Sequence, residues 1–586
     1  MNPRLPSLFA IAAIAVGPLL LPEYYLTLMN YIGLASLVTL GLVLLTGVAG
    51  LTSFGQAAFV GLGAYATAVV TTKYGGSPWL GLAVGLALTA IVALFLGFIT
   101  LRLSDQYLPL GTIAWGISIY FAFGNLVFLG QHTGITGIPH ISVFGWTIDT
   151  AARLYLAIWL VVVSALLAAR NLLDSRIGRA IRTLNGHTKM AESFGIDTGR
   201  LKIIVFVYSA LLASVAGWLY AHFLRYVSPS PFGIDAGIDY LFMAVIGGSG
   251  HIWGAVVGAS VLTLLQEWLK DFLPHVLGHN GNYEIVVFGL LVVLLLHRTS
   301  DGLLPFLARM IRSGEHWDKP AFAAPLAQRP RPVKGESLLV IDNISKNFGP
   351  VAAVNELSFQ LKAGEIVGLI GPNGAGKSTV FNLTTGLQPV TKGSIRFRGQ
   401  LIEQLGGREI AGLGIARTFQ HPNLLTDLSA LENVAIGAYL RGQCGLIAAS
   451  LRLDRAEEAR LRDEAARQLH RVGLGSHLYD TAGTLPLGSQ RVLEIARALC
   501  ADPLLLLLDE PAAGLRHLEK QSLAALLGDL RDGGVSILLV EHDMNFVMGL
   551  ADRVVVMEFG RRIAEGAPHA IQSNPAVLEA YLGGAT

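Results

Sequence analysis

The sequence predicts a multi-domain protein, with an N-terminal α-helical membrane domain and a soluble C-terminal α/β domain. The chain has 586 residues, more than the roughly 100 to 200 that one compact domain usually holds. Hydrophobic residues make up 52% of the chain and charged residues 14%, whereas globular proteins average about 25% charged residues. The apolar excess indicates a lipid bilayer. Short strand-like runs that alternate with helical stretches follow it and indicate an α/β domain.

The N-terminal half is predicted to be polytopic. Between Tyr24 and Ile148 the only charged residues are Lys73, Arg102 and Asp105, while one helical crossing needs about 20 apolar residues. The apolar runs predict about ten passages, of which the eighth and ninth are short for a span. They lie near residues 5–22, 26–48, 54–72, 79–101, 107–129, 152–169, 203–224, 239–250, 254–268 and 284–297.

Charge placement predicts the orientation of these passages. The loop from Arg170 to Lys202 carries seven Lys and Arg residues against three Asp and Glu residues, which is typical of a cytosolic loop. Counting crossings from this loop places the soluble half in the cytosol as well. We therefore expect a transmembrane permease domain at 1–300, a proline-containing cytosolic linker at 301–336 and the soluble domain at 337–586.

Composition argues against several other classes of protein. The net charge is only +2, so no overall positive field suggests that the chain binds nucleic acid. The two cysteines, Cys444 and Cys500, have no spacing typical of a metal site or a disulfide framework. We interpret them as thiols in a reducing cytosol.

A phosphate-binding loop is the clearest motif. The buried-strand pattern Ile366 to Ile370 leads directly into it, and a helical stretch follows. Glycines let backbone N–H groups turn toward phosphates, Lys377 reaches the β and γ phosphates, and Ser378 is expected to bind Mg²⁺. The loop alone does not separate kinases, GTPases and transport ATPases. Its residues are Gly371, Pro372, Asn373, Gly374, Ala375, Gly376, Lys377, Ser378 and Thr379.

Four further residues, in the expected order, favour a transport ATPase. The apolar run Leu504 to Leu508 ends in Asp509 and Glu510, which predicts one carboxylate for Mg²⁺ and one that activates the attacking water. Gln420 and His542 lie where side chains could contact the γ phosphate. Taken singly, Gln420 and His542 are better explained as a surface glutamine and a core histidine, and a strand can end in two acids by chance, although less often. Together and in this order, the four residues favour the ATPase.

From Ser337 onward the sequence resembles the ATPase domain of the ABC transporter family. This resemblance implies a P-loop ABC ATPase fold with a helical subdomain, and a second ATPase subunit so that two domains enclose two ATP molecules. It implies that Phe348 stacks on adenine, that Gly488 of the signature motif approaches a phosphate, and that Glu510, His542 and Gln420 are catalytic. The implied cofactors are ATP and Mg²⁺, with Ser378, Gln420 and Asp509 at the metal.

The signature motif departs from the family pattern. Where the family usually has Leu-Ser-x-Gly-Gln, this chain has Leu-Pro-Leu-Gly-Ser-Gln at 485–490. Pro486 has neither a hydroxyl nor a backbone N–H, so two donors to a γ phosphate are missing. We therefore expect two unequal ATP sites in the assembled protein. Arg516, where the family often has Asp or Asn, is a second departure, in the loop between the two ATPase domains.

Both halves resemble importers of branched-chain amino acids. In the ATPase half the segments 417–420, 452–469 and 566–583 carry this resemblance, and in the N-terminal half the segments 50–65, 175–196, 228–233 and 246–250 do. The resemblance implies a bacterial inner membrane location, a second permease subunit and an extracytoplasmic solute-binding protein. It also implies that 175–196 is a coupling helix that docks on an ATPase, although a solvated basic loop would have a similar composition.

The function we expect is ATP-driven import of a branched-chain amino acid or a related amino acid or amide. Urea, short amides and aromatic acids are alternative solutes. An exporter is disfavoured by the short loops, and a membrane-tethered regulatory ATPase without solute flux is disfavoured by the many crossings. Gln56, Asn125 and Gln266 could face a translocation path, but helix–helix hydrogen bonds explain them better. The small residues of 55–68 suit close helix packing.

Overall fold

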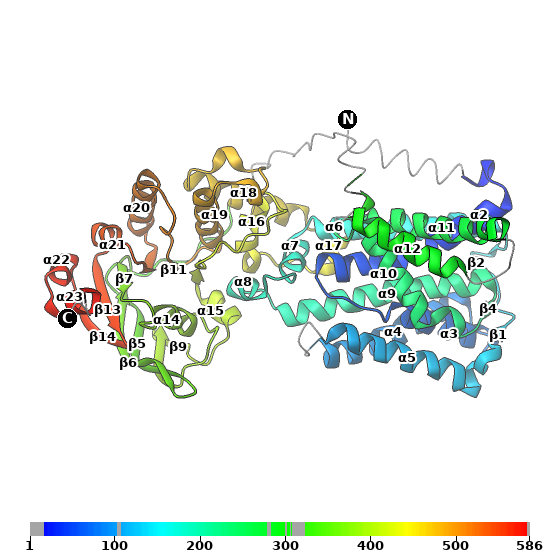
Figure 1. Ribbon diagram of the computed structural model, residues 1–586, viewed down its shortest axis with the longest axis horizontal. Helices are drawn as coiled ribbons and strands as arrows, with labels where there is room; N and C mark the ends of the chain where they lie inside the picture. Colours follow the sequence, from blue (N-terminus) through cyan, green and yellow to red (C-terminus); the bar gives the residue numbers. More distant parts are fainter. Residues whose placement is uncertain are drawn as a thin grey trace.

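The computed structural model describes residues 17–101, 107–277, 283–298, 302–304, 306 and 323–582. The molecule is elongated, with the apolar helices at one end and the α/β domain at the other (Figure 1). Most of the first expected passage, 5–22, and most of the expected linker before residue 323 lie outside the described residues.

Nine apolar helices lie within the described part of the N-terminal half, and each matches one of the second to tenth expected passages. They are α2 Glu23–Leu42, which continues into the π-helical η1 Val43–Val48, α3 Gln56–Thr72, α4 Pro78–Thr100, α5 Leu108–Asn125, α6 Ala151–Leu173, α9 Thr198–Leu224, α10 Ile234–Gly248, α11 Gly254–Leu277 and α12 Tyr283–Arg298. Short two-stranded sheets pair β1 Ile135–Thr136 with β4 Tyr226–Val227, and β2 Ile141–Val143 with β3 Trp146–Ile148.

The expected ten passages are not confirmed. Among the described residues, four helices are long and apolar enough to cross a membrane, or five if the pair bent by 79° after Asn125 is one span. The others fall short because α3, α10 and α12 have 17, 15 and 16 residues, against about 20 for a full crossing. The longer α11 contains three charged residues, Glu267, Lys270 and Asp271.

Small residues let the membrane helices approach closely. A Cβ atom built on Gly63 of α3 would lie 2.2 Å from the backbone oxygen of Ser214 in α9, and one on Gly217 would lie 1.9 Å from that of Val60. Close backbone contact through small residues is the usual way in which helices associate in lipid. The packing explanation of this glycine-rich segment therefore has direct structural support.

The α/β domain is built on two sheets. The six-stranded sheet has the order β10-β11-β12-β7-β13-β14, and all its neighbours are parallel except β13 and β14. A four-stranded antiparallel sheet, β6-β5-β8-β9, was not foreseen from the sequence. The strands are β5 Ser337–Phe348, β6 Val351–Lys362, β7 Ile366–Ile370, β8 Lys392–Phe397, β9 Gln400–Leu401, β10 Ile415–Arg417, β11 Leu505–Asp509, β12 Ser536–Val540, β13 Arg553–Glu558 and β14 Arg561–Gly566.

A separate helical lobe stands beside the sheets. Apolar side chains of α16, α18 and α19 form a core of their own, distinct from the core around β5 and β7. Leu326, from the described part of the expected linker, is buried in this lobe. The α/β-domain helices are α14 Lys377–Thr384, α15 Gly407–Leu413, α16 Ala430–Gly437, α17 Leu446–Ser450, α18 Arg455–Arg471, α19 Leu487–Cys500, α20 His517–Asp532, α21 Met544–Leu550, α22 Pro568–Gln572 and α23 Pro575–Leu582.

Candidate active site

The phosphate-binding loop has the backbone that its glycines predict. It leaves β7 at Gly371 and enters α14 at Lys377, and both Gly374 and Gly376 have a positive φ, of 83° and 98°. A Cβ atom on Gly376 would lie 2.3 Å from the backbone oxygen of Ala353. A side chain there would therefore collide with β6 as well as strain the backbone. The loop wraps the N-terminus of α14, where a phosphate is favoured by free N–H groups and the helix dipole.

Lys377 is folded back onto the loop. Its Nζ donates hydrogen bonds to the backbone oxygens of Gly371 and Pro372, at 2.7 and 3.0 Å. Burial lowers the pKa of Lys377, and the negative charges of Glu510 and Asp509 act in the opposite direction. The lysine is thus held at the loop and close to the carboxylates at the end of β11. Ser378 and Thr379 follow it in the first turn of α14.

Asp509 is buried at the C-terminal end of β11. Its Oδ2 lies 3.7 Å from Nη2 of Arg417, and its Oδ1 is buried with no hydrogen-bond partner among the described residues. Burial raises the pKa of Asp509 and the charge of Arg417 opposes that shift. A buried carboxylate oxygen without a donor is suited to a Mg²⁺ ion or to a water molecule bound to one. The residues present therefore fit the expected metal.

The three expected catalytic side chains meet at Glu510. Its Oε2 accepts a hydrogen bond from Nε2 of Gln420 at 3.2 Å, and its Oε1 lies 2.6 Å from Nε2 of His542. The backbone of Glu510 has a φ of 50°, and its oxygen accepts a hydrogen bond from Arg491. A non-glycine residue in this left-handed conformation stores strain that is common at functional sites.

Glu541 belongs to this site and was not singled out from the sequence. Its carboxylate is buried and accepts hydrogen bonds from the backbone N–H groups of Ala512, at 2.6 Å, and of His542, at 3.1 Å. Burial raises the pKa of Glu541 and these backbone donors oppose the shift. The side chain therefore ties the turn after Glu510 to the segment that carries His542. The only available signal was its position directly before that histidine.

Two expected nucleotide contacts lie outside the Glu510 cluster. Phe348 ends β5 and is 47% exposed, with the ammonium of Lys346 at 5.3 Å from its ring centre. The following strand, β6, contacts the phosphate loop at Gly376, so the exposed ring stands on the same hairpin. Gly488 lies in the first turn of α19, beside Leu515 and Glu519, where Pro486 is the N-cap.

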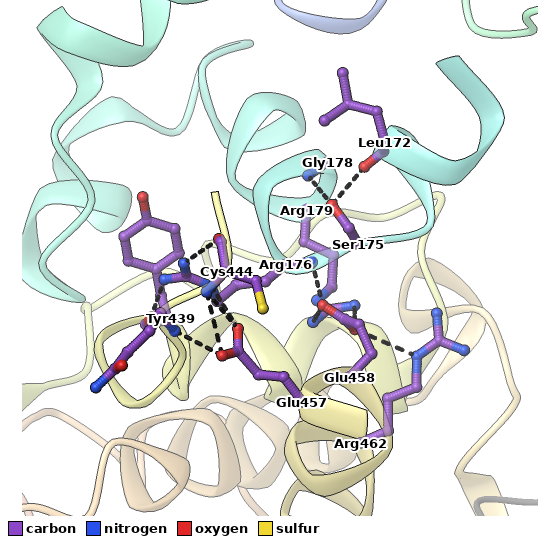
Figure 2. A network of polar contacts seen from close by, with 11 residues as sticks. Leu172, Ser175, Arg176, Gly178, Arg179, Tyr439, Cys444, Glu457, Glu458 and Arg462 are labelled. Carbon is purple, nitrogen blue, oxygen red and sulfur yellow. Dashed lines mark hydrogen bonds and ion pairs between the residues drawn. The ribbon is translucent and has the colours of Figure 1, made fainter. Parts of the chain in front are cut away.

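Two short helices of the membrane half dock on the α/β domain, namely α7 Arg176–Thr183 and α8 Thr188–Ser193. Figure 2 shows that Arg176 and Arg179 of α7 point into a socket formed by the segment 439–444 and by Glu457 and Glu458 of α18. Nη1 of Arg179 lies 2.9 Å from Oε2 of Glu458. The segment 175–196 is therefore a docking element and not a freely solvated loop.

Contacts of Asn423 connect this docking element to the nucleotide site. Asn423 lies three residues after Gln420. Its backbone N–H donates a hydrogen bond to Glu494 at 2.9 Å, and its backbone oxygen accepts one from Arg497 at 2.7 Å. Its side-chain oxygen lies 3.3 Å from Nδ1 of His187, in the membrane half. Because Glu494 and Arg497 lie on α19, one residue joins the glutamine segment, the signature helix and the docking element.

Comparisons with known proteins agree for both halves. The permease component of the branched-chain amino acid transport system matches residues 24–296, the ABC transporter domain matches 354–513, and the branched-chain amino acid ATP-binding cassette transporter model matches 561–586.

Similar curated proteins match the C-terminal half. The high-affinity branched-chain amino acid transport ATP-binding protein LivG of Salmonella typhimurium is 43% identical over 251 residues, which are 42% of this chain and 98% of LivG. The corresponding protein BraF of Pseudomonas aeruginosa is 40% identical over 249 residues, again 42% and 98%. A crystal structure of a nucleotide-free ATP-binding cassette is 31% identical over 42% of this chain and all of that chain, with a TM-score of 0.39.

Proposed function

The chain belongs to the branched-chain amino acid family of ABC transporters, and we propose that it imports a branched-chain amino acid or a closely related amino acid or amide. Permease and ATPase are one polypeptide, and hydrolysis of ATP is coupled to transport. The observation that carries the proposal is the docking of the permease on the ATPase at two places, where α7 enters the socket and where His187 meets Asn423, three residues after Gln420 of the nucleotide site.

The nucleotide site supports one role for each group. The loop from Gly371 to Thr379 holds the phosphates, and Lys377 exchanges its bonds to the loop oxygens for bonds to the β and γ phosphates. Ser378, Gln420 and Asp509 would hold Mg²⁺, which neutralises charge that develops on the phosphates. Phe348 is assigned to the adenine ring.

Glu510 is assigned as the group that orients and deprotonates the attacking water. Its two oxygens are held by Gln420 and His542, which supports a shared role for the three side chains around a γ phosphate. When the nucleotide is bound, Gln420 would turn toward the phosphate, and through Asn423 this displacement would reach His187 of the permease. Hydrolysis of ATP would then reverse this displacement.

The remaining subunits of the transporter are other polypeptide chains. One chain supplies one permease and one ATPase, so a second of each is required, together with an extracytoplasmic solute-binding protein. We place the assembly in a bacterial inner membrane with the ATPase in the cytosol. The shorter apolar helices α3, α10 and α12, and the more charged α11, would also lie in the bilayer, giving about ten passages with the N-terminal run.

The departure at Pro486 suggests unequal ATP sites. In the family each ATP is held by the phosphate loop of one domain and the signature of the other. Pro486 caps α19 without a side-chain hydrogen bond, so Gly488 would serve a second nucleotide without the usual hydroxyl. The phosphate loop of this chain would then face the better signature of a partner and form the stronger site.

Uptake of radiolabelled leucine tests the proposal directly. The assembled complex in proteoliposomes, supplied with its binding protein and with ATP on the ATPase side, should accumulate leucine, and unlabelled isoleucine and valine should compete. Competition by urea, short amides or aromatic acids alone would reassign the solute. ATP hydrolysis without flux of any of these solutes would contradict the proposal and favour a regulatory ATPase.

A further inference from the structure

The docking interface carries ion pairs of opposite polarity at its two ends. At α7 the permease contributes two arginines and the ATPase two glutamates (Figure 2). At the start of α9 the order is reversed, because Asp197 of the permease lies 2.6 Å from Arg408 of α15 in the ATPase. The permease therefore contributes positive charges at one contact and a negative charge at the other.

The Arg179–Glu458 pair is the buried ion pair of this interface. Arg179 is 2% exposed and the Glu458 side chain 12%, and both arginine Nη atoms lie within 3.2 Å of the glutamate oxygens. Without Arg179, Glu458 would keep, among the described residues, only Arg462, at 3.8 Å, and the backbone N–H of Arg176, and a buried charge that is poorly compensated costs more than the pair contributes. A permease without a cation at this position would therefore dock poorly on this ATPase.

Arg176 and Glu457 form a second contact of the socket, in which Arg176 fills a loop and Glu457 holds that loop in shape. The Arg176 guanidinium donates to the backbone oxygens of Tyr439 and Cys444, at 2.6 and 2.8 Å, and lies 4.7 Å from the Tyr439 ring centre. Glu457 accepts from the N–H groups of Gln443 and Cys444, at 2.8 and 3.0 Å, and so shapes the loop that receives the arginine. A planar fork of donors is needed to fill this socket, which lysine would not supply.

The Asp197–Arg408 pair distinguishes the observed docking orientation from the reversed one. These side chains are 37% and 53% exposed, so the pair is screened and adds little affinity. In a reversed arrangement, however, Asp197 would face Glu457 and Glu458, and the α7 arginines would face Arg408. Opposed like charges reject a wrong partner or orientation more strongly than matched charges favour the right one.

We propose that these two contacts form an electrostatic address by which the permease selects its ATPase. The partner it accepts is an ATPase domain with two consecutive carboxylates at the start of α18 and an arginine at the start of α15. In an assembly with two permeases and two ATPases, the address keeps the permease of this chain on its own ATPase domain. Only this last consequence rests on the proposed function.

Cross-linking measures the docking without any transport assay. Asn171 of the permease donates from Nδ2 to the backbone oxygen of Ser450 at 3.0 Å, so Asn171→Cys and Ser450→Cys in a Cys444→Ser full-length chain should react with a short bifunctional thiol reagent. Arg179→Glu and Glu458→Arg should each lower the cross-linking rate about tenfold or more, and the double variant should recover most of it. Basal ATP hydrolysis in detergent reports that the ATPase is folded.

A matched reversal controls for nonspecific charge effects. Arg170→Glu changes the same charge in the last turn of α6, at a side chain that is 50% exposed and pairs with Asp174 inside the permease, and it should change the rate less than about twofold. Equal loss with Arg170→Glu, or no recovery in the double variant with basal ATPase intact, overturns the address. Recovered cross-linking in a complex that moves no solute would overturn the proposed function and leave the address standing.

Discussion

The nucleotide site and the docking socket are both built from charged side chains, but they hold them in opposite ways. At the nucleotide site Asp509 Oδ1 has no hydrogen-bond partner in the described structure and Glu510 has a strained backbone. At the socket Arg179 faces Glu458, and Arg176 is held by two backbone oxygens and by Glu457. The nucleotide site thus has a carboxylate oxygen and a strained backbone that suit a ligand, while the charged groups of the socket form ion pairs across the interface. Mutations should therefore separate chemistry from coupling.

The largest expected effect is at the chemical site. Glu510→Gln removes the proton acceptor but keeps an amide that Gln420 and His542 can contact. We expect ATP hydrolysis to fall by about 10² to 10⁴-fold, because this is the usual contribution of a positioned general base. ATP should still bind, which a nucleotide-dependent rise in melting temperature would reveal. Hydrolysis within a fewfold of the parent rate would mean that another group activates the water.

Arg179→Glu should give the converse result. Basal ATP hydrolysis in detergent should stay within about threefold of the parent, since Arg179 touches no group at the nucleotide site, whereas stimulation by the loaded binding protein should fall about tenfold or more. The ratio of stimulated to basal hydrolysis measures this. Equal losses of both rates would show that docking and chemistry are not separate functions.

Pro486→Ser tests the unequal sites. The serine would restore a hydroxyl and a backbone N–H at the N-cap of α19, where the structure has no side-chain cap. We expect hydrolysis by the assembled complex to rise by up to about tenfold, since a charge-assisted hydrogen bond is worth about 1.5 to 3 kcal/mol before the cost of rearrangement. A rate equal to the parent's would count against unequal sites.

Asp509→Asn should stabilise the nucleotide-free protein. Burial raises the pKa of Asp509 above its unfolded value, so the unfolded carboxyl loses its proton first and ionisation disfavours the fold as pH rises between the two values. A neutral amide avoids this cost, and Arg417, 3.7 Å from Asp509, would keep its hydrogen bonds to Asn382 and Thr385. Scanning calorimetry without nucleotide should show a higher melting temperature at pH 7 than for the parent, and a smaller difference at pH 4. A lower melting temperature at pH 7 would show that the charge of Asp509 does not destabilise the nucleotide-free fold.

The smallest effect is expected at the exposed end of the interface. Arg408→Ala removes the partner of Asp197 and should weaken docking by only about 0.2 to 1 kcal/mol at low salt. The difference from the parent in cross-linking rate should largely vanish at about 1 M salt, where the Debye length is near 3 Å. A large effect that persists in high salt would give this pair an energetic role that its exposure does not predict.

The two sites also differ in how far the sequence predicted them. Gly371 to Lys377, Asp509 and Glu510 could be expected to lie together because each follows a short apolar strand, and parallel strands bring their C-terminal ends together. Their roles stay predictions. Glu541 was missed because a buried carboxylate that accepts backbone N–H groups has no pattern of its own. Phe348 and Gly488 remain predictions, since their partner would be a nucleotide or a second chain.

The socket could not be derived from the chain's local pattern. Arg179 and Glu458 are 279 positions apart, and nothing near either residue specifies the other. The segment 175–196 was expected to dock, but its acidic partners in the helical insertion were not identified. The number of membrane passages was not confirmed, because apolar runs such as α3 and α10 form helices that are shorter than a full span.

The most direct test of the whole account measures leucine uptake and ATP hydrolysis in the same proteoliposomes, for the parent, Glu510→Gln and Arg179→Glu complexes. The account predicts uptake with hydrolysis for the parent, neither for Glu510→Gln, and hydrolysis without uptake for Arg179→Glu. Leucine uptake by the Arg179→Glu complex at the parent's rate, with hydrolysis also unchanged, would contradict the claim that this chain drives its own permease through the α7 socket.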